Sequence, residues 1–141
     1  MQEALVNIEL ALLADYAGVM ADGKLMVAGV FDTLSVPVLP ATPPIIYLAL
    51  RIAGDGGEVG KHQLELRFVD PDGTPIVPVL HGEFDLEDLQ SEGGTARVQF
   101  VMGMAGVAFS KLGPHALDIL LDGRYEMSVP VDVQQVAPPG R

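Results

Sequence analysis

The chain alternates apolar and polar residues with a period of two, between short clusters of Gly, Pro and Asp. In residues 63–68, for example, Leu64, Leu66 and Phe68 alternate with polar or charged neighbours. Successive side chains of a β-strand point to opposite faces, so this period predicts strands with one face toward a core. About eight such runs, spaced roughly 8 to 12 residues apart with turn signals between them, are typical of a sandwich. We therefore predict an all-β fold, a two-sheet antiparallel β-sandwich of immunoglobulin-like or jelly-roll-like type with about eight strands.

The length and the lack of cysteine narrow the class further. The 141 residues suffice for one domain that buries roughly two thirds of its unfolded surface, and we assign residues 1–136 to it. Residues 137–141, Ala-Pro-Pro-Gly-Arg, are predicted to be a disordered tail. The chain has no cysteine, which excludes disulfides, thiolate metal sites and cysteine nucleophiles, and favours the cytoplasm.

The N-terminal residues and the apolar runs give no sign of export or membrane insertion. The first residues lack a basic region and include Glu3 and Glu9, unlike a secretory signal. The longest apolar stretches run for about ten residues, well short of the roughly 20 that cross a bilayer. We expect a cytoplasmic protein without a membrane span.

The charge and the apolar content point to different kinds of partner. The net charge of −11 repels phosphate backbones, so nucleic acid is not an expected partner. Yet 49% of the residues are hydrophobic and only 19% are charged. We expect part of this apolar excess to lie in an intermolecular interface.

Several segments carry more specific predictions. Residues 25–34 are apolar on both faces, which predicts a central strand covered on both sides. Residues 36–44 contain four prolines and are predicted to cross between the sheets. A further strand is expected to pass through Gly103 and Gly106 and to end at Gly113. Asp122-Gly123 between two alternating runs predicts a hairpin with a type I′ turn.

Two groups of residues invite a metal hypothesis, and we favour a simpler interpretation of both. Asp70, Asp72 and Gly73 resemble the start of a calcium loop, but the later ligand positions hold unsuitable residues. We interpret them as a turn in which Asp70 caps its own backbone and Gly73 adopts positive φ. The three histidines come from separate predicted strands and share no zinc motif; they are His62, His81 and His115. We expect no metal and no cofactor.

The sequence contains no recognisable catalytic constellation. Its serines lie in no nucleophile elbow, and Gly54-Asp-Gly-Gly lacks the Lys-Ser/Thr of a phosphate-binding loop. The acids between Glu83 and Glu92 are better explained as a solvated face than as a glycosidase pair. We therefore predict no catalytic residue and expect a protein that is not an enzyme.

A set of short motifs resembles an uncharacterised bacterial family, a domain of unknown function. The motifs are Leu13-Ala-Asp-Tyr-Ala, Gly23-Lys-Leu, Gly29-Val-Phe-Asp, Val69-Asp-Pro-Asp-Gly, and the closing stretch from Gly113 through Asp122-Gly123 to Val129-Pro-Val. They span nearly the whole chain. The resemblance implies a single bacterial sandwich domain and no activity that can be transferred.

The first three of these motifs also supply candidate binding residues. A strand-end tyrosine, Tyr16, can bury its ring and bond nearby backbone as a tyrosine corner does, whereas a functional interpretation places it at one end of the sandwich with neighbouring charges. Tyrosines on outward positions are further candidates. The candidate binding residues are Asp15, Tyr16, Lys24, Asp32, Tyr47 and Tyr125.

These observations favour a non-catalytic interaction module whose partner is another protein or itself, acting as an adaptor or as a self-assembling subunit. Antiparallel edges permit strand addition between chains, and methionines such as Met26 and Met102 offer adaptable apolar surface. The alternative is a module that binds a small ligand, a carbohydrate or a metal, through the loops at residues 54–60 and 87–94.

Overall fold

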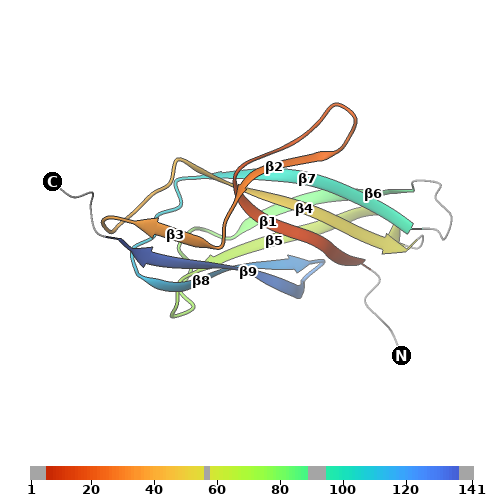
Figure 1. The fold of residues 1–141 in the computed structure, drawn as a ribbon. Helices are drawn as coiled ribbons and strands as arrows, with labels where there is room; N and C mark the ends of the chain where they lie inside the picture. Colours follow the sequence, from red (N-terminus) through yellow and green to blue (C-terminus); the bar gives the residue numbers. More distant parts are fainter. Residues whose placement is uncertain (1–5, 56–57, 89–94, 137–141) are drawn as a thin grey trace.

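The computed structural model describes residues 6–55, 58–88 and 95–136. The predicted tail at 137–141 and most of the loop at 87–94 lie outside these ranges. The described residues form an all-β fold (Figure 1), and they include no helix long and apolar enough to cross a membrane. The strands are β1 (Val6–Val19), β2 (Leu25–Val30), β3 (Thr33–Val36), β4 (Ile45–Asp55), β5 (Gly60–Val69), β6 (Leu80–Asp88), β7 (Thr95–Ala105), β8 (Gly113–Leu121) and β9 (Arg124–Gln135).

The strands form two sheets, as predicted. Sheet A has the order β2-β1-β4-β7, and sheet B has the order β6-β5-β8-β9-β3. They are joined where Glu87 and Asp88 of β6 pair with Arg97 and Ala96 of β7. The described pairings are antiparallel except for β3 with β9, which is parallel. Figure 1 shows the strands of sheet A lying above β8 and β9 of sheet B.

The core fills the space between the sheets and follows the alternation in the sequence. In β5, Leu64, Leu66 and Phe68 are buried while Gln63 and Arg67 are exposed. Sheet A contributes a matching row, Ile46, Leu48, Leu50 and Ile52 of β4. Each such side chain contributes about 1.5 to 3 kcal/mol on burial, so the alternating residues of the central strands supply most of the driving force for folding.

The prediction of one central strand over residues 25–34 is wrong. The segment is divided at Phe31-Asp32 into β2 and β3, and β2 is a largely exposed edge strand of sheet A. The N–H of Phe31 donates to the Leu13 carbonyl in sheet A at 3.0 Å, and the Asp32 carbonyl accepts from the N–H of Asp132 in sheet B at 2.8 Å. The segment pairs with two sheets in turn, and most residues of its β2 part are exposed although they are apolar.

The predicted crossover at residues 36–44 is confirmed, since it carries the chain from β3 in sheet B to β4 in sheet A. The strand predicted to continue through Gly106 ends earlier: β7 stops at Ala105, Gly106 has φ +76°, and Gly113 opens β8. Gly103, within β7, lies against the side chain of Tyr47. A Cβ there would lie 3.3 Å from Cε1 of Tyr47.

Candidate functional site

The first hairpin extends beyond the sheet to which it belongs. The last pair between β1 and β4 is Ala14 with Tyr47, so the later residues of β1 pair only with β2. The turn is closed by the Gly23 N–H donating to the Met20 carbonyl at 2.8 Å, with Gly23 at φ +89°. We call residues 15–30 the β1–β2 arm. Figure 1 shows it in orange, standing off the sheet above β7.

One polar contact holds the tip of the arm against sheet A. The side-chain amide of Gln99, on β7, donates to the carbonyl of Gly23 in the turn. The same amide group accepts from Nε of Arg51, on β4, at 3.1 Å. The arm therefore folds back over the outer surface of sheet A.

The arm carries exposed apolar side chains and an open strand edge. Five of its large apolar residues are between 45% and 55% exposed: Tyr16, Val19, Met20, Met26 and Val30. Among the described strands, β2 pairs only with β1. No charged residue or proline interrupts Leu25–Val30, although natural edge strands commonly use both to discourage pairing with other chains.

The structure brings only some of the candidate binding residues together. Asp15 and Tyr16 lie at the base of the arm, Lys24 follows its turn, and Asp32 lies beyond the far end of β2. The six residues of β2 separate Lys24 from Asp32 by about 20 Å along the strand. These residues do not form one cluster, and a binding role for them stays a prediction.

The candidate tyrosines occupy two places. The rings of Tyr16 and Tyr47 meet edge to face, with centroids 5.3 Å apart on sheet A. The tyrosine-corner interpretation of Tyr16 is wrong, because its side chain is 49% exposed and packs on Tyr47 instead of entering the core. Tyr125 is 61% exposed on β9 of sheet B, where its hydroxyl is 2.7 Å from Oγ of Ser128.

Gly29 explains part of the motif at the base of the arm. It has φ +74°, and a Cβ at this position would lie 2.5 Å from Oδ2 of Asp15 on the neighbouring strand. Only glycine meets both conditions without strain. Gly29 is therefore required by the structure, because the backbone has positive φ and the Asp15 side chain occupies the space that a Cβ would need.

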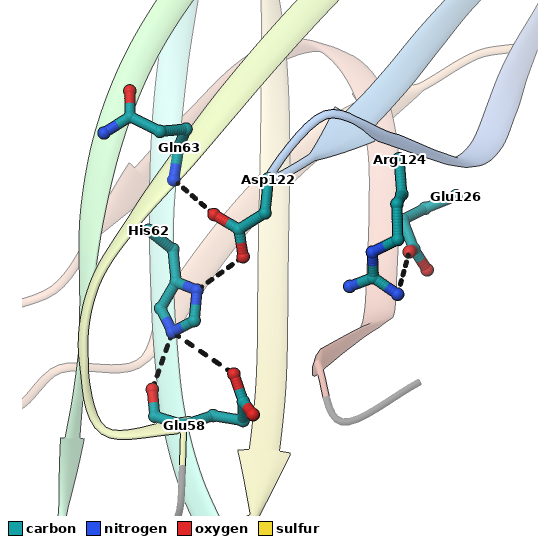
Figure 2. Close-up of polar contacts among 6 residues, drawn as sticks. All are labelled: Glu58, His62, Gln63, Asp122, Arg124 and Glu126. Carbon is teal, nitrogen blue, oxygen red and sulfur yellow. Dashed lines mark hydrogen bonds and ion pairs between the residues drawn. The ribbon is translucent and has the colours of Figure 1, made fainter. Parts of the chain in front are cut away.

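A cluster of ionisable groups surrounds His62, one of the three histidines that share no zinc motif (Figure 2). His62, at the start of β5, is only 8% exposed and stacks on Phe84 of β6 with centroids 5.4 Å apart. Its Nδ1 lies 2.7 Å from Oδ2 of Asp122, and its Nε2 lies 2.6 Å from the Glu58 carbonyl. The N–H of Gln63 donates to Oδ1 of Asp122 at 2.9 Å.

These contacts favour the charged form of both groups. Burial lowers the pKa of His62, but the Glu58 carbonyl and the Asp122 carboxylate outweigh it and hold the pKa above its ordinary value. Burial raises the pKa of Asp122, yet the Gln63 N–H and the His62 ring bring it below its ordinary value. A charged imidazole donates from both nitrogens, so the cluster ties β5 and the preceding loop to the β8–β9 turn.

The type I′ turn predicted at Asp122-Gly123 is present, with φ +51° and +82°. The sequence does not predict that the Asp122 side chain also accepts hydrogen bonds from His62 and from the N–H of Gln63. The only available signal was that His62 shares the inward phase of Leu64, Leu66 and Phe68. That signal predicts burial of His62 but not its partner.

The remaining candidate metal ligands have other surroundings. Nδ1 of His115 donates to the Gly113 carbonyl at 3.0 Å, while His81 is exposed on β6. Within the described part of the chain, no three His, Asp or Glu side chains converge as a metal site would require.

The predicted self-capping turn at Asp70 is present. Its Oδ1 accepts from the N–H of Asp72 at 2.9 Å and of Thr74 at 3.0 Å, and Gly73 has φ +83°. The Thr74 bond, together with the ammonium of Lys111 at 3.2 Å from Oδ2, keeps the pKa of Asp70 below its ordinary value. The Asp70 and Asp72 carboxylates of this turn are therefore paired with the ammonium group of Lys111.

Described residues also line two surface pockets. One, of about 340 Å³, opens where β6 and β7 diverge, and its lining includes Val77, Leu80, Met102, Met104 and Val107. The other, of about 280 Å³, lies between β1 and β9, where the chain crosses from β2 to β3, and its lining includes Leu12, Leu13, Phe31, Asp32, Val129 and Pro130.

Comparisons with known proteins give a family and a distant structural likeness. A model of DUF6941, a family of unknown function, matches residues 9–134. No curated protein matches the chain. The Pseudomonas fluorescens alkylpurine DNA glycosylase AlkC, bound to DNA containing an abasic site analog, is similar with a TM-score of 0.48 and 13% sequence identity. The match covers 93% of this chain but only 31% of the glycosylase chain, and no argument about function follows from it.

Proposed function

Because the chain belongs to DUF6941, a family of unknown function, we propose a function from its geometry: a non-catalytic module that acts by protein contact through the β1–β2 arm. The protein is then either an adaptor, whose arm holds a partner protein, or a self-assembling subunit, whose arm contacts a second copy. The observation that carries this proposal is the coincidence of an open strand edge with exposed apolar side chains, Met26 and Val30 among them, on one projecting hairpin.

Physical chemistry explains why such a hairpin suits protein contact. An edge strand offers unpaired N–H and C=O groups, and an added strand supplies main-chain hydrogen bonds without requiring a particular sequence. Apolar side chains beside that edge contribute about 25 cal/mol for each Å² that the partner covers. The net charge of −11 meanwhile disfavours association between copies that lack a specific contact.

The experiment is capture from the native host. The tagged protein is crosslinked in the cell, purified and analysed by mass spectrometry, beside a Met26→Ser/Val30→Ser double variant. Val38→Ser is the matched control, because Val38 is 63% exposed but lies outside the arm. We expect a stoichiometric partner, or a ladder of multiples of the bait, that the double variant loses and the control keeps. Monomeric bait alone, or capture indifferent to the double variant, contradicts the proposal.

A second candidate function is the binding of a small ligand, favoured by the pocket between β6 and β7. Its volume of about 340 Å³ lies at the low end of the range of ligand sites, roughly 300 to 1,000 Å³. Its lining has neither an aromatic ring nor a carboxylate, so an apolar ligand suits it better than a carbohydrate or a metal. Met102→Trp should then abolish binding of a fluorescent apolar probe, whereas Met26→Trp, outside the pocket, should not.

A further inference from the structure

We propose that the pocket at the base of the arm binds a lysine or arginine side chain of an extended segment from a partner protein. The pocket, of about 280 Å³, lies between β1 and β9, and Val30, at the end of β2, forms part of its lining. We call it the Asp32 pocket. This inference rests on the proposed function, because it names the chemistry that the arm's partner must present.

The lining of the Asp32 pocket combines apolar walls with a single charge. The walls come from Leu12 and Leu13 of β1, from Phe31, and from Val129 and Pro130 of β9, and Asp32 is the one charged residue of the lining. Lysine and arginine side chains have the complementary form, an aliphatic stem that packs on apolar surface and a cationic end. A neutral apolar side chain would pack against the walls of the pocket but would leave the Asp32 carboxylate without a partner.

Asp32 has no cation of its own in the described part of the chain. Each close cation–carboxylate pair there involves other acids, such as Asp22 with Lys24 and Asp72 with Lys111. Among residues 6–55, 58–88 and 95–136, the side-chain hydrogen bond to Asp32 comes from the adjacent Thr33 hydroxyl at 3.3 Å. Its carboxylate therefore remains available to a charged group that enters from outside.

The position of the pocket explains why the basic residue should belong to an extended segment. Val30 is both the last residue of β2 and part of the pocket lining. A strand added along the open edge of β2 would therefore run toward the pocket. In strand addition the main chain gives affinity, and pockets for individual side chains give specificity. The net charge of −11 also steers a basic segment toward the protein.

The first test uses a fragment as the probe. Pentylammonium is titrated into isotope-labelled protein, and amide chemical shifts are followed at residues 11–13, 30–32, 129 and 131. Pentanol is the neutral control ligand. We expect saturable shifts that localise to these residues, with pentylammonium binding about tenfold more tightly than pentanol because of one charge-assisted contact. Shifts spread over all surface carboxylates, or equal affinities for the two ligands, would overturn the proposal.

Matched variants separate the site from the overall charge. Asp32→Asn and Asp22→Asn remove the same charge, but Asp22 lies in the turn of the arm, away from the pocket. We expect Asp32→Asn to remove the preference for pentylammonium and Asp22→Asn to keep it. Asp32 is exposed, and within the described residues its side chain bonds only the neighbouring Thr33, so the variant should fold. An equal effect of both variants contradicts the proposal.

Capture from the host distinguishes this inference from the function on which it rests. If Asp32→Asn and Asp32→Lys lose the partner as Met26→Ser/Val30→Ser does, both are supported. If the double variant loses the partner while both Asp32 variants keep it, the Asp32 pocket is wrong and the arm is right. If none of these variants changes what is captured, both are wrong.

Discussion

Two hairpins in this protein contain the same Asp-Gly dipeptide, Asp22-Gly23 and Asp122-Gly123, and yet they have opposite surroundings. In the β8–β9 hairpin both turn residues have positive φ, and the Asp122 side chain reaches His62 and Gln63 on β5. In the β1–β2 arm only the glycine has positive φ, and the Asp22 side chain bonds the nearby N–H of Lys24. A dipeptide thus sets the turn in both hairpins, whereas the contacts with distant strands differ: the buried His62 of β5 meets the Asp122 side chain, and the side-chain amide of Gln99 on β7 meets the Gly23 carbonyl.

The largest difference should appear when one apolar residue is truncated in each hairpin. Val131, on β9, is completely buried, and Val30, on β2, is 55% exposed. We expect Val131→Ala to lower the free energy of unfolding by roughly 2 to 3 kcal/mol, because it leaves a cavity. Val30→Ala should change it by less than about 0.5 kcal/mol, as surface substitutions usually do. Chemical denaturation measures both, and similar losses would mean that the arm is part of the cooperative core.

Truncation of the two turn aspartates should change the free energy of unfolding by amounts that differ less. Asp122→Ala removes a charge-assisted hydrogen bond to His62 and a second bond to Gln63, and should cost about 2 kcal/mol. Asp22→Ala removes an exposed local contact and should cost about 0.5 kcal/mol. Asp122→Asn is the informative control, since Asn-Gly also favours a type I′ turn. Asp122→Asn keeps a side-chain acceptor and removes the charge, so full stability of this variant would show that the carboxylate charge does not fix this hairpin.

Within the arm, two glycines should respond unequally. Both have positive φ, but a Cβ at Gly29 meets Asp15 while one at Gly23 meets nothing within 4 Å. Either alanine variant should cost about 1 kcal/mol or slightly more for the backbone alone. Gly29→Ala should lose more, and adding Asp15→Ser should recover part of the difference. Thermal melting of the three variants measures this, and equal losses for Gly23→Ala and Gly29→Ala would argue against a contact with Asp15.

The smallest expected effect is the pH dependence that His62 gives the β8–β9 hairpin. Its pKa is raised above the ordinary value of 6.5, so its contribution is complete below that value and is lost as pH rises through the raised pKa. Asp122 has the opposite sign, because its lowered pKa makes its contribution disappear as pH falls. Denaturation of the native chain and of His62→Gln across neutral and alkaline pH measures the first effect. An unchanged slope in His62→Gln would assign the pH dependence to other groups.

The sequence predicts well those parts of the molecule in which local pattern and burial agree. Alternation places β4 and β5 and the inward phase of Leu64, and turn chemistry predicts the Asp122-Gly123 hairpin and the self-capped Asp70 turn. It fails at residues 25–34, because an apolar strand looks the same whether a second layer or nothing covers it. The exposure of β2 depends on where the chain crosses between the sheets, at Phe31-Asp32.

The candidate site is harder to predict for a similar reason. His62 and Asp122 meet across 60 residues, and no spacing rule connects a strand residue to a turn so distant in the chain. Asp32 was predicted as a binding residue together with Lys24, but β2 holds the two apart, and its neighbours in the pocket come from β1 and β9. Residue type identifies such candidates, whereas the topology decides which of them become neighbours.

The crossing at Phe31-Asp32 also determines how a mechanical load would travel through the molecule. Successive residues bond the Leu13 carbonyl in one sheet and the Asp132 N–H in the other. A pull on the arm by a bound partner would therefore act on both sheets at this crossing. The arm is an attachment point through which tension can pass into the whole sandwich.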